Sequence, residues 1–300
     1  MENISSLIKK ISLGDNQVIA RSISLIENEA NGYEDLLKSL PVGNVPVIGI
    51  TGSPGAGKST LVNLLIEKFK NENKKVAVLC VDPSSPFSHG ALLGDRVRMN
   101  KWYNDPDVFI RSFATRGSLG GLHPKIIEIT ELIKAAPFDC IIIETVGVGQ
   151  TEVEIAGLSD ITVVVFVPES GDDIQVMKAG LIEIANIFVV NKSDRPGADE
   201  FVMNLQLMSN YSSHHVHDIP IIKTIATEKI GIDELVSAIK LKLTVNNNRK
   251  IKLIAEKAYQ IIMHQKMKHI SKQEIENKIE ETLKSGDFNL YKFVELYFSE

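Results

Sequence analysis

Cysteine is scarce in this sequence of 300 residues, where it occurs only as Cys80 and Cys140. Each cysteine lies in an apolar run, VAVLCV and CIIIETV, which is typical of buried thiols in a reducing compartment. A disulfide framework of the kind that staples small secreted domains is therefore not expected. With 44 % hydrophobic and 24 % charged residues, the composition also excludes collagen-like and long disordered chains.

The sequence also lacks a basic excess and any long apolar run. Its 33 lysines and arginines stand against 38 aspartates and glutamates, which gives a net charge of −5 and argues against nucleic acid as a partner. The longest apolar runs, such as Ile161–Val167, fall far short of the ~20 residues that span a bilayer. The start, MENISSLIKK, has no signal-peptide hydrophobic region. We expect a cytoplasmic protein that has no membrane partner.

What the sequence does contain is an alternation of short apolar runs and helical patterns. Seven β-branched runs predict strands: Val45–Thr51, Lys75–Val81, Val108–Phe113, Cys140–Val146, Ile161–Val167, Asn186–Asn191 and Ile219–Ile225. Apolar residues at helical spacing predict helices at Lys58–Lys70, Pro124–Ala135, Ala198–Met208 and Ile232–Leu243. Strands that are apolar on both sides are typical of a parallel sheet covered by helices on both faces. The predicted fold is α/β, doubly wound, with a mostly parallel sheet.

Both ends of the chain carry helical patterns instead of this alternation. Residues 1–44 predict a helical arm, residues 45–245 the α/β domain, and residues 246–300 a C-terminal helical segment. The C-terminal segment has an apolar stripe at helical spacing, formed by Ile251, Ile254, Ala258, Ile261 and Ile262. Such a stripe packs on the core or forms a dimerisation or partner surface.

The segment after the first predicted strand has the pattern of a phosphate-binding loop. Gly52-Ser-Pro-Gly-Ala-Gly-Lys-Ser-Thr60 matches GxxxxGK[ST] and stands between a strand and a helix, the context that this motif requires. Its backbone N–H groups form an anion nest, Lys58 bridges terminal phosphates, and the Ser59 hydroxyl can bind Mg²⁺. The residues expected to contact a nucleoside triphosphate are Gly52, Ser53, Pro54, Gly55, Ala56, Gly57, Lys58, Ser59 and Thr60.

A second motif, Asn191-Lys-Ser-Asp194, follows a later predicted strand and indicates which base is bound. The Asp194 carboxylate can accept hydrogen bonds from both guanine N1–H and the exocyclic amine, a pair of donors that adenine does not present. Lys192 is expected to lay its stem over the base, and Asn191 to tie this loop to the phosphate loop. The end of the last strand is expected to complete the base pocket with Ile225, Ala226 and Thr227. The predicted ligand is GTP or GDP.

Acidic residues at two strand ends are candidates for Mg²⁺ binding. Asp82 follows one predicted strand, Glu144 ends another, and Asp95 lies in a glycine-punctuated loop between them. Glu144-Thr-Val-Gly147 is a Glu variant of the DxxG pattern, whose glycine N–H senses the γ-phosphate. The predicted metal ligands are Ser59, Asp82, Asp95 and Glu144, and the predicted catalytic residues are Lys58, Asp82, Asp95, Glu144 and Gly147.

The residue after Gly147 is Val148, so the water-orienting glutamine of Ras-like switches is missing at that position. We infer slow intrinsic hydrolysis, with the attacking water held by an acid such as Asp82 or by a partner.

Several motifs taken together resemble one family. VDPSSPF, LLGDRVRM, RSFATRGSLGGL, ETVGVGQTEVE and GDDIQVMKAG, with the phosphate loop and NKSDRPGAD, resemble the methylmalonyl-CoA mutase-associated GTPases (MeaB/MMAA type, also labelled ArgK-like). The resemblance covers roughly residues 45–235. It implies a homodimeric, Mg²⁺-dependent GTPase that gates loading and protection of the B12 cofactor of an acyl-CoA mutase, such as methylmalonyl-CoA mutase. It also places Asp82, Asp95 and Glu144 at Mg²⁺ and switch positions, and Glu169–Gly180 at the segment that faces the mutase.

The sequence departs from the family pattern at two places, and three other functions stay open. His123 stands where the family usually has a small residue, and Glu169-Ser170 replaces a more glycine-rich turn. A nickel-delivery GTPase would use a histidine cluster, here His214, His215 and His217. A small-molecule kinase is compatible with the phosphate loop, although nothing marks an acceptor pocket. A nucleotide-dependent scaffold with negligible turnover fits the missing glutamine.

Overall fold

The computed structural model describes residues 3–82, 99–114, 122–145, 153–169, 181–211, 219–244, 249–267, 270–284 and 288–295. The chain divides into two compact units, Met1–Lys250 and Ile251–Glu300. Within the described ranges, no helix is both long enough and apolar enough to cross a membrane.

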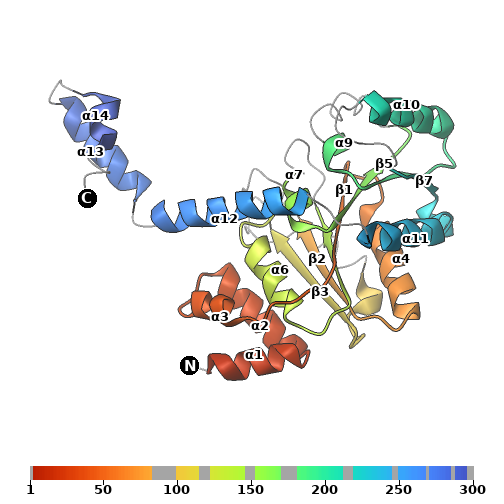
Figure 1. The fold of residues 1–300 in the computed structure, drawn as a ribbon, viewed down its shortest axis with the longest axis horizontal. Helices are drawn as coiled ribbons and strands as arrows, with labels where there is room; N and C mark the ends of the chain where they lie inside the picture. Colours follow the sequence, from red (N-terminus) through yellow and green to blue (C-terminus); the bar gives the residue numbers. More distant parts are fainter. Residues whose placement is uncertain are drawn as a thin grey trace. The chain divides into compact units, whose positions relative to one another are not determined.

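The first unit is built on a seven-stranded sheet with the order β3-β2-β4-β1-β5-β6-β7 (Figure 1). The strands are β1 (Val47–Gly52), β2 (Val76–Asp82), β3 (Val108–Ala114), β4 (Cys140–Glu144), β5 (Ile161–Phe166), β6 (Ile187–Asn191) and β7 (Ile221–Thr224). Every pair of neighbouring strands is parallel. All seven predicted runs are strands, and the doubly wound parallel fold predicted from the sequence is confirmed.

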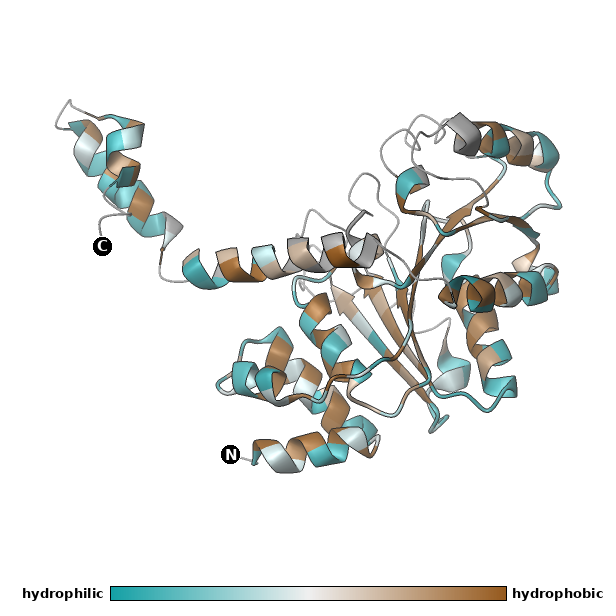
Figure 2. Cartoon of the chain, viewed as in Figure 1, coloured by the Kyte–Doolittle hydropathy of each residue, from teal (hydrophilic) through white to brown (hydrophobic). Residues whose placement is uncertain are grey.

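Helices cover both faces of the sheet, which explains why its strands are apolar on both sides (Figure 2). Helices α4 (Lys58–Asn71) and α11 (Ile232–Leu243) pack on one face, where Ile48 and Val78 point. The opposite face, to which Val47 and Ala77 point, is covered by α2 (Asn16–Glu27), α6 (Ile126–Lys134) and α7 (Val153–Leu158). A smaller cluster packs α10 (Ala198–Tyr211) against β5 and β6. The other elements among the described residues of this unit are α1 (Ile4–Ser12), α3 (Tyr33–Ser39), α9 (Leu181–Ile184) and the 3₁₀ turns η1 (Asn100–Trp102) and η3 (Ala226–Glu228).

The N-terminal helical arm belongs to the first compact unit. Its helix α2 begins at the N-cap Asp15, whose carboxylate accepts hydrogen bonds from two backbone N–H groups of the first turn. The buried face of α2 includes Ile19 and Ile23. Arg111 of β3 donates to Glu27 at 2.7 Å, which ties the end of α2 to the sheet.

Both cysteines are buried thiols that form no disulfide, as the sequence predicted. Cys80 lies opposite Glu144 in the register of β2 and β4, whereas Cys140 lies opposite Val76. Four residues of strand separate the two thiols, about 13 Å, which is too far for a disulfide. Burial raises the pKa of the Cys140 thiol to about 12, so it stays protonated and chemically inert.

The second unit is helical, with α12 (Arg249–Met267, which begins in the last residues of the first unit), α13 (Lys272–Lys284) and α14 (Leu290–Glu295). Phe293 is buried, and its ring centroid lies 5.9 Å from that of Phe288, with the two ring planes tilted by 49°. Large apolar side chains of α12 are exposed, among them Ile251, Tyr259 and Ile262.

Candidate functional site

The predicted site residues come from distant segments that meet at one edge of the sheet. Because the strands are parallel, their carboxyl ends share an edge, which is where ligands bind in open α/β sheets. Strand β1 ends at Gly52, β2 at Asp82, β4 at Glu144 and β6 at Asn191. The candidate site is therefore assembled at this edge, between the end of β1 and the start of α4.

The phosphate-loop motif connects β1 to α4 through glycines at which any other residue would be strained. Gly52 has a φ of +137°, and a Cβ there would lie 2.0 Å from the Val165 carbonyl oxygen. Gly57 has a φ of +92°, and a Cβ there would lie 2.3 Å from the Asn191 side-chain nitrogen. The loop is thus pressed against β5 on one side and against the end of β6 on the other.

Lys58 is the first residue of α4, and its side chain folds back over the loop. Its Nζ donates to the Gly52 carbonyl at 2.7 Å and to the Ser53 carbonyl at 3.1 Å, and the residue is buried. The ammonium therefore lies where the loop and the N-terminus of a 14-residue helix concentrate positive potential. This arrangement suits a polyphosphate anion.

Two of the predicted metal ligands, Ser59 and Glu144, are in direct contact. The Ser59 hydroxyl donates to Glu144 Oε1 at 2.7 Å, and both residues are buried. Hydroxyl and carboxylate oxygens are the ligands that Mg²⁺ prefers, so the donor chemistry of this pair fits that ion. Asp82 is the last residue of β2 at the same edge, and Asp95 and Gly147 lie outside the described residues.

A pair of threonines, not singled out from the sequence, fixes the strand ends beside this contact. The hydroxyls of Thr51 and Thr145 lie 2.8 Å apart and are buried. The Thr145 N–H also donates to the Ile50 carbonyl at 3.1 Å, which extends the contact between β1 and β4. Because Thr145 directly follows Glu144, the pair holds the carboxylate in place next to Ser59. Two threonines at strand ends have no pattern that would have revealed them.

Asn191 joins three segments of the site with one buried side chain. Its Nδ2 donates to the Ala56 carbonyl of the phosphate loop at 2.8 Å. Its Oδ1 accepts from the Thr224 hydroxyl at 3.0 Å and from the Ala226 N–H at 3.1 Å. The amide thus links the NKxD motif to the phosphate loop, as expected, and also to the end of β7. Thr224 was not predicted to take part.

The rest of the NKxD motif lies at the surface of this edge. Lys192 has a φ of +56°, a left-handed conformation that is uncommon outside glycine and asparagine. Ser193 is held by two hydrogen bonds to the Thr224 carbonyl, one from its N–H and one from its hydroxyl. Asp194 is exposed, so its carboxylate is accessible to a ligand.

Arg195, the next residue, forms an ion pair with Glu169 after β5. The Arg195 guanidinium holds the pKa of the Glu169 carboxyl below its usual range. The sequence marks Glu169 as a departure from the family pattern but does not indicate this partner. Residues 170–180, which follow Glu169, lie outside the described residues.

The third predicted part of the base pocket, Ile225–Thr227, belongs to a closed loop. Ile225 and Ile230 exchange two backbone hydrogen bonds of 3.2 Å, which close the loop around η3. Ala226 is buried and presents its N–H to Asn191, whereas Thr227 is exposed. The structure thus brings this loop next to the NKxD motif.

The histidines do not form a metal site in the part of the chain that the structure describes. His214, His215 and His217 lie outside it, and the described residues contain no group of three or more His, Cys, Asp or Glu able to hold a metal ion. His123 is buried against the Phe113 ring, with centroids 5.5 Å apart, and its Nδ1 accepts from the Lys125 N–H at 3.2 Å.

Comparisons with known proteins find similar chains by sequence and by fold. The family model described as methylmalonyl-CoA mutase-associated GTPase MeaB matches residues 19–283. A Pyrococcus abyssi protein named as a GTPase is 42 % identical over 292 residues, covering 95 % of this chain and 89 % of the relative. The fused isobutyryl-CoA mutase of Geobacillus kaustophilus is 38 % identical over 244 residues, covering 75 % of this chain and 22 % of that protein. A crystal structure titled LAO/AO transport system kinase matches with a TM-score of 0.65 and 23 % identity, over 98 % of this chain and 95 % of that one, a likeness of fold alone.

Proposed function

The chain belongs to the family of methylmalonyl-CoA mutase-associated GTPases, and we propose that it gates loading and protection of the B12 cofactor of an acyl-CoA mutase. Membership makes the chain a GTPase with a phosphate-loop fold. The observation that carries the finer proposal is the relative in which a segment similar to this chain lies within a fused isobutyryl-CoA mutase. Fusion holds two partners at a high effective concentration, and in our proposal this separate chain binds its mutase non-covalently instead.

In this proposal GTP or GDP binds at the carboxyl edge of the sheet. The loop from Gly52 to Thr60 holds the phosphates through its N–H groups, and the Lys58 ammonium moves from the loop carbonyls to the terminal phosphate oxygens. Asp194 accepts from the guanine edge, Lys192 covers the base, and Ile225–Thr227 complete the pocket. The Asn191 contacts support this assignment, because they hold the phosphate and base segments at a fixed separation.

Mg²⁺ is the expected metal, and Ser59, Asp82, Asp95 and Glu144 would hold it. When bound, the ion neutralises the charge that develops on the phosphates during hydrolysis. The residues of the chain supply the remaining electrostatic stabilisation through Lys58 and the loop N–H groups. Because Val148 replaces the water-orienting glutamine, intrinsic turnover is slow, and an acid such as Asp82 or the partner positions the water. Gly147 would contribute its N–H to the γ-phosphate.

We also propose that the chain is a homodimer and that residues 246–300 contribute to its interface. The exposed apolar side chains of α12 support this, since several large apolar side chains on one helix are costly to leave in water. Light scattering on Ile262→Glu should show monomers at concentrations where the original chain is dimeric. Gln260→Glu adds the same charge on the opposite side of the helix and should leave the dimer intact. Equal molar masses for all three proteins would contradict this interface.

The mutase proposal is tested by mixing the chain with a B12-dependent isobutyryl- or methylmalonyl-CoA mutase. Size-exclusion chromatography in GDP and in a non-hydrolysable GTP analogue should give a complex whose amount differs between the two nucleotides. Released phosphate should appear faster in the presence of the mutase. If the amount of complex is the same in both nucleotides and phosphate release is not accelerated, the result would favour a scaffold with negligible turnover. Phosphate transferred to a small molecule would identify a kinase, and tight nickel binding that depends on residues 214–217 would identify a metallochaperone.

A further inference from the structure

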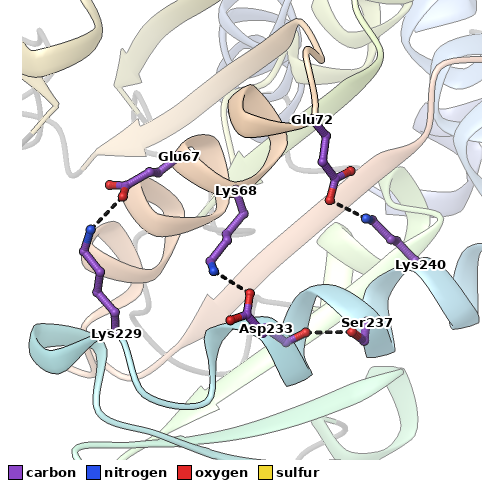
Figure 3. A network of polar contacts seen from close by, with 7 residues as sticks. All are labelled: Glu67, Lys68, Glu72, Lys229, Asp233, Ser237 and Lys240. Carbon is purple, nitrogen blue, oxygen red and sulfur yellow. Dashed lines mark hydrogen bonds and ion pairs between the residues drawn. The ribbon is translucent and has the colours of Figure 1, made fainter.

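Ion pairs connect α4, the helix that begins at the phosphate loop, to the segment that follows β7 (Figure 3). Lys229 pairs with Glu67, Lys68 with Asp233, and Lys240 with Glu72. Asp233 and Lys240 belong to α11, so their pairs join two helices. Lys229 is different, because it lies on the closed loop between Ile225 and Ile230.

The Lys229 pair is attached to the hydrogen-bonded Ile225–Ile230 loop, which supplies part of the proposed base pocket. The loop is closed by the two backbone bonds between Ile225 and Ile230, and it is fixed from within by the Ala226 N–H on Asn191. Lys229 Nζ donates to Glu67 Oε1 at 2.6 Å from the outer side. A displacement of Lys229 is therefore expected to displace Ala226 and the rest of the Ile225–Ile230 loop with it.

Glu67 receives two ammonium groups at once. Its Oε1 accepts from Lys229, and its Oε2 accepts from Lys101 of η1 at 3.1 Å. The hydrogen bonds from Lys229 and then Lys101 hold the pKa of the Glu67 carboxyl below its usual range, so it is ionised at neutral pH. Glu67 lies about two and a half turns after Lys58 on the same helix. The helix that begins at the phosphate loop therefore also contacts the Ile225–Ile230 loop, through Glu67.

The backbone conformation of Lys229 is one that lysine rarely adopts. Its φ is +61°, a left-handed conformation in which glycine or asparagine costs less than lysine. The strained position is occupied by a side chain that reaches α4, and the ion pair offsets part of the cost.

We propose that Lys229 and Glu67 are positioning residues that set the distance between the guanine pocket and the phosphate loop. The inference rests on the proposed base pocket, and it concerns affinity for the nucleotide and not the chemical step. Asn191 makes the inner connection between the two loops and the Lys229 pair makes the outer one. Loss of the outer connection lets the Ile225–Ile230 loop move away from α4, which weakens the binding of GTP and of GDP to the same extent.

The test uses Lys229→Asn, which keeps a residue suited to the left-handed conformation and removes the charge. We expect its GDP and GTP dissociation constants to rise about two- to five-fold, the range for one exposed ion pair, with kcat unchanged and KM raised. Lys229→Arg should restore the affinity. Because salt screens the pair, the difference between the original chain and Lys229→Asn should shrink at high ionic strength.

Two further variants separate positioning from general stabilisation. Lys240→Gln removes an ion pair of the same kind between α4 and α11 and should leave both dissociation constants unchanged. In a double-mutant cycle, the effects of Glu67→Gln and Lys229→Asn on the dissociation constants should not add, because both remove the contact between Glu67 and Lys229. The contact with Lys101 that Glu67→Gln also removes lies on η1 and not on the Ile225–Ile230 loop. Unchanged affinity in Lys229→Asn, or an equal loss in Lys240→Gln, would overturn the inference while leaving the nucleotide site intact. Equal binding of GTP and ATP by the original chain would instead refute the base pocket itself.

Discussion

The Asn191 side chain should be the most sensitive single position for both stability and nucleotide affinity. Its amide makes three hydrogen bonds, to the Ala56 carbonyl, the Thr224 hydroxyl and the Ala226 N–H, and the residue is 2 % exposed. Each such hydrogen bond contributes about 1 kcal/mol to the free energy of unfolding, and its loss leaves a buried polar group without that hydrogen-bond partner. Asn191→Ala should therefore lower the free energy of unfolding by about 3 kcal/mol.

Asn191→Asp isolates the contact with the phosphate loop. The carboxylate keeps an oxygen for Thr224 and Ala226, but it has no donor for the Ala56 carbonyl and repels that oxygen. We expect about 1–3 kcal/mol of destabilisation and GDP affinity at least roughly ten-fold weaker, since the loop is pushed away from the base segment. Asn186→Ala is the matched control, because Asn186 precedes β6 and accepts from the Thr162 N–H at 2.8 Å at the opposite edge of the sheet. It should cost about 1 kcal/mol and leave GDP binding unchanged.

Urea unfolding and titration with a fluorescent GDP analogue measure the two quantities on the same preparations. A loss of 3 kcal/mol corresponds to a fall of about 1 M in the urea midpoint for a slope of ~3 kcal/mol per M. Asn191→Asp that binds GDP as tightly as the original chain would refute the role given to this amide. An Asn186→Ala variant that weakens GDP binding as much as Asn191→Asp does would also refute it.

Three further predictions concern the base, the metal and pH. Asp194→Asn should shift preference from guanine to xanthine nucleotides, and unchanged GTP and XTP affinities would count against the base assignment. Glu144→Gln should slow Mg²⁺-dependent phosphate release and raise the Mg²⁺ concentration needed for half-maximal rate; a normal Mg²⁺ titration would exclude Glu144 as a ligand. The lowered pKa of Glu67 means that its ion pairs stabilise the fold above its ordinary pKa of 4.5 and lose this effect as the pH falls through the lower folded-state value. The stability difference between the original chain and Glu67→Gln should therefore be constant from pH 6 to 8 and vanish in acid, and a difference that persists at the lowest pH would contradict the ion pairs.

The sheet could be predicted from the sequence because helices cover both of its faces. Residues such as Ile48 and Val47 point to opposite faces and are both buried, which produces the continuous apolar runs. Predicted and observed strand ends differ by small margins; for example, Cys140–Val146 was expected and β4 ends at Glu144. The helices α7 and α9 were missed because their described parts, of six and four residues, are too short to display a helical period.

The motifs of the site could be predicted, but the contacts that join them could not. The phosphate loop and the NKxD motif have fixed local spacings, which a sequence displays directly. The contacts Thr51 with Thr145, Asn191 with Thr224, and Glu67 with Lys229 join residues that are far apart in the chain. Such partners depend on strand order and helix packing, and single threonines, glutamates and lysines carry no local signal of them.

Cofactor loading of a B12-dependent acyl-CoA mutase tests the proposed function most directly. The full chain, the apo-mutase and adenosylcobalamin are mixed with GTP, GDP or a non-hydrolysable GTP analogue, and the mutase-bound cofactor is followed by its absorbance. We predict that the rate or extent of loading depends on the nucleotide, and that Lys58→Ala, which cannot hold the triphosphate, abolishes this dependence. Identical loading in all three nucleotides, by a chain that binds GTP and hydrolyses it, would contradict the proposal.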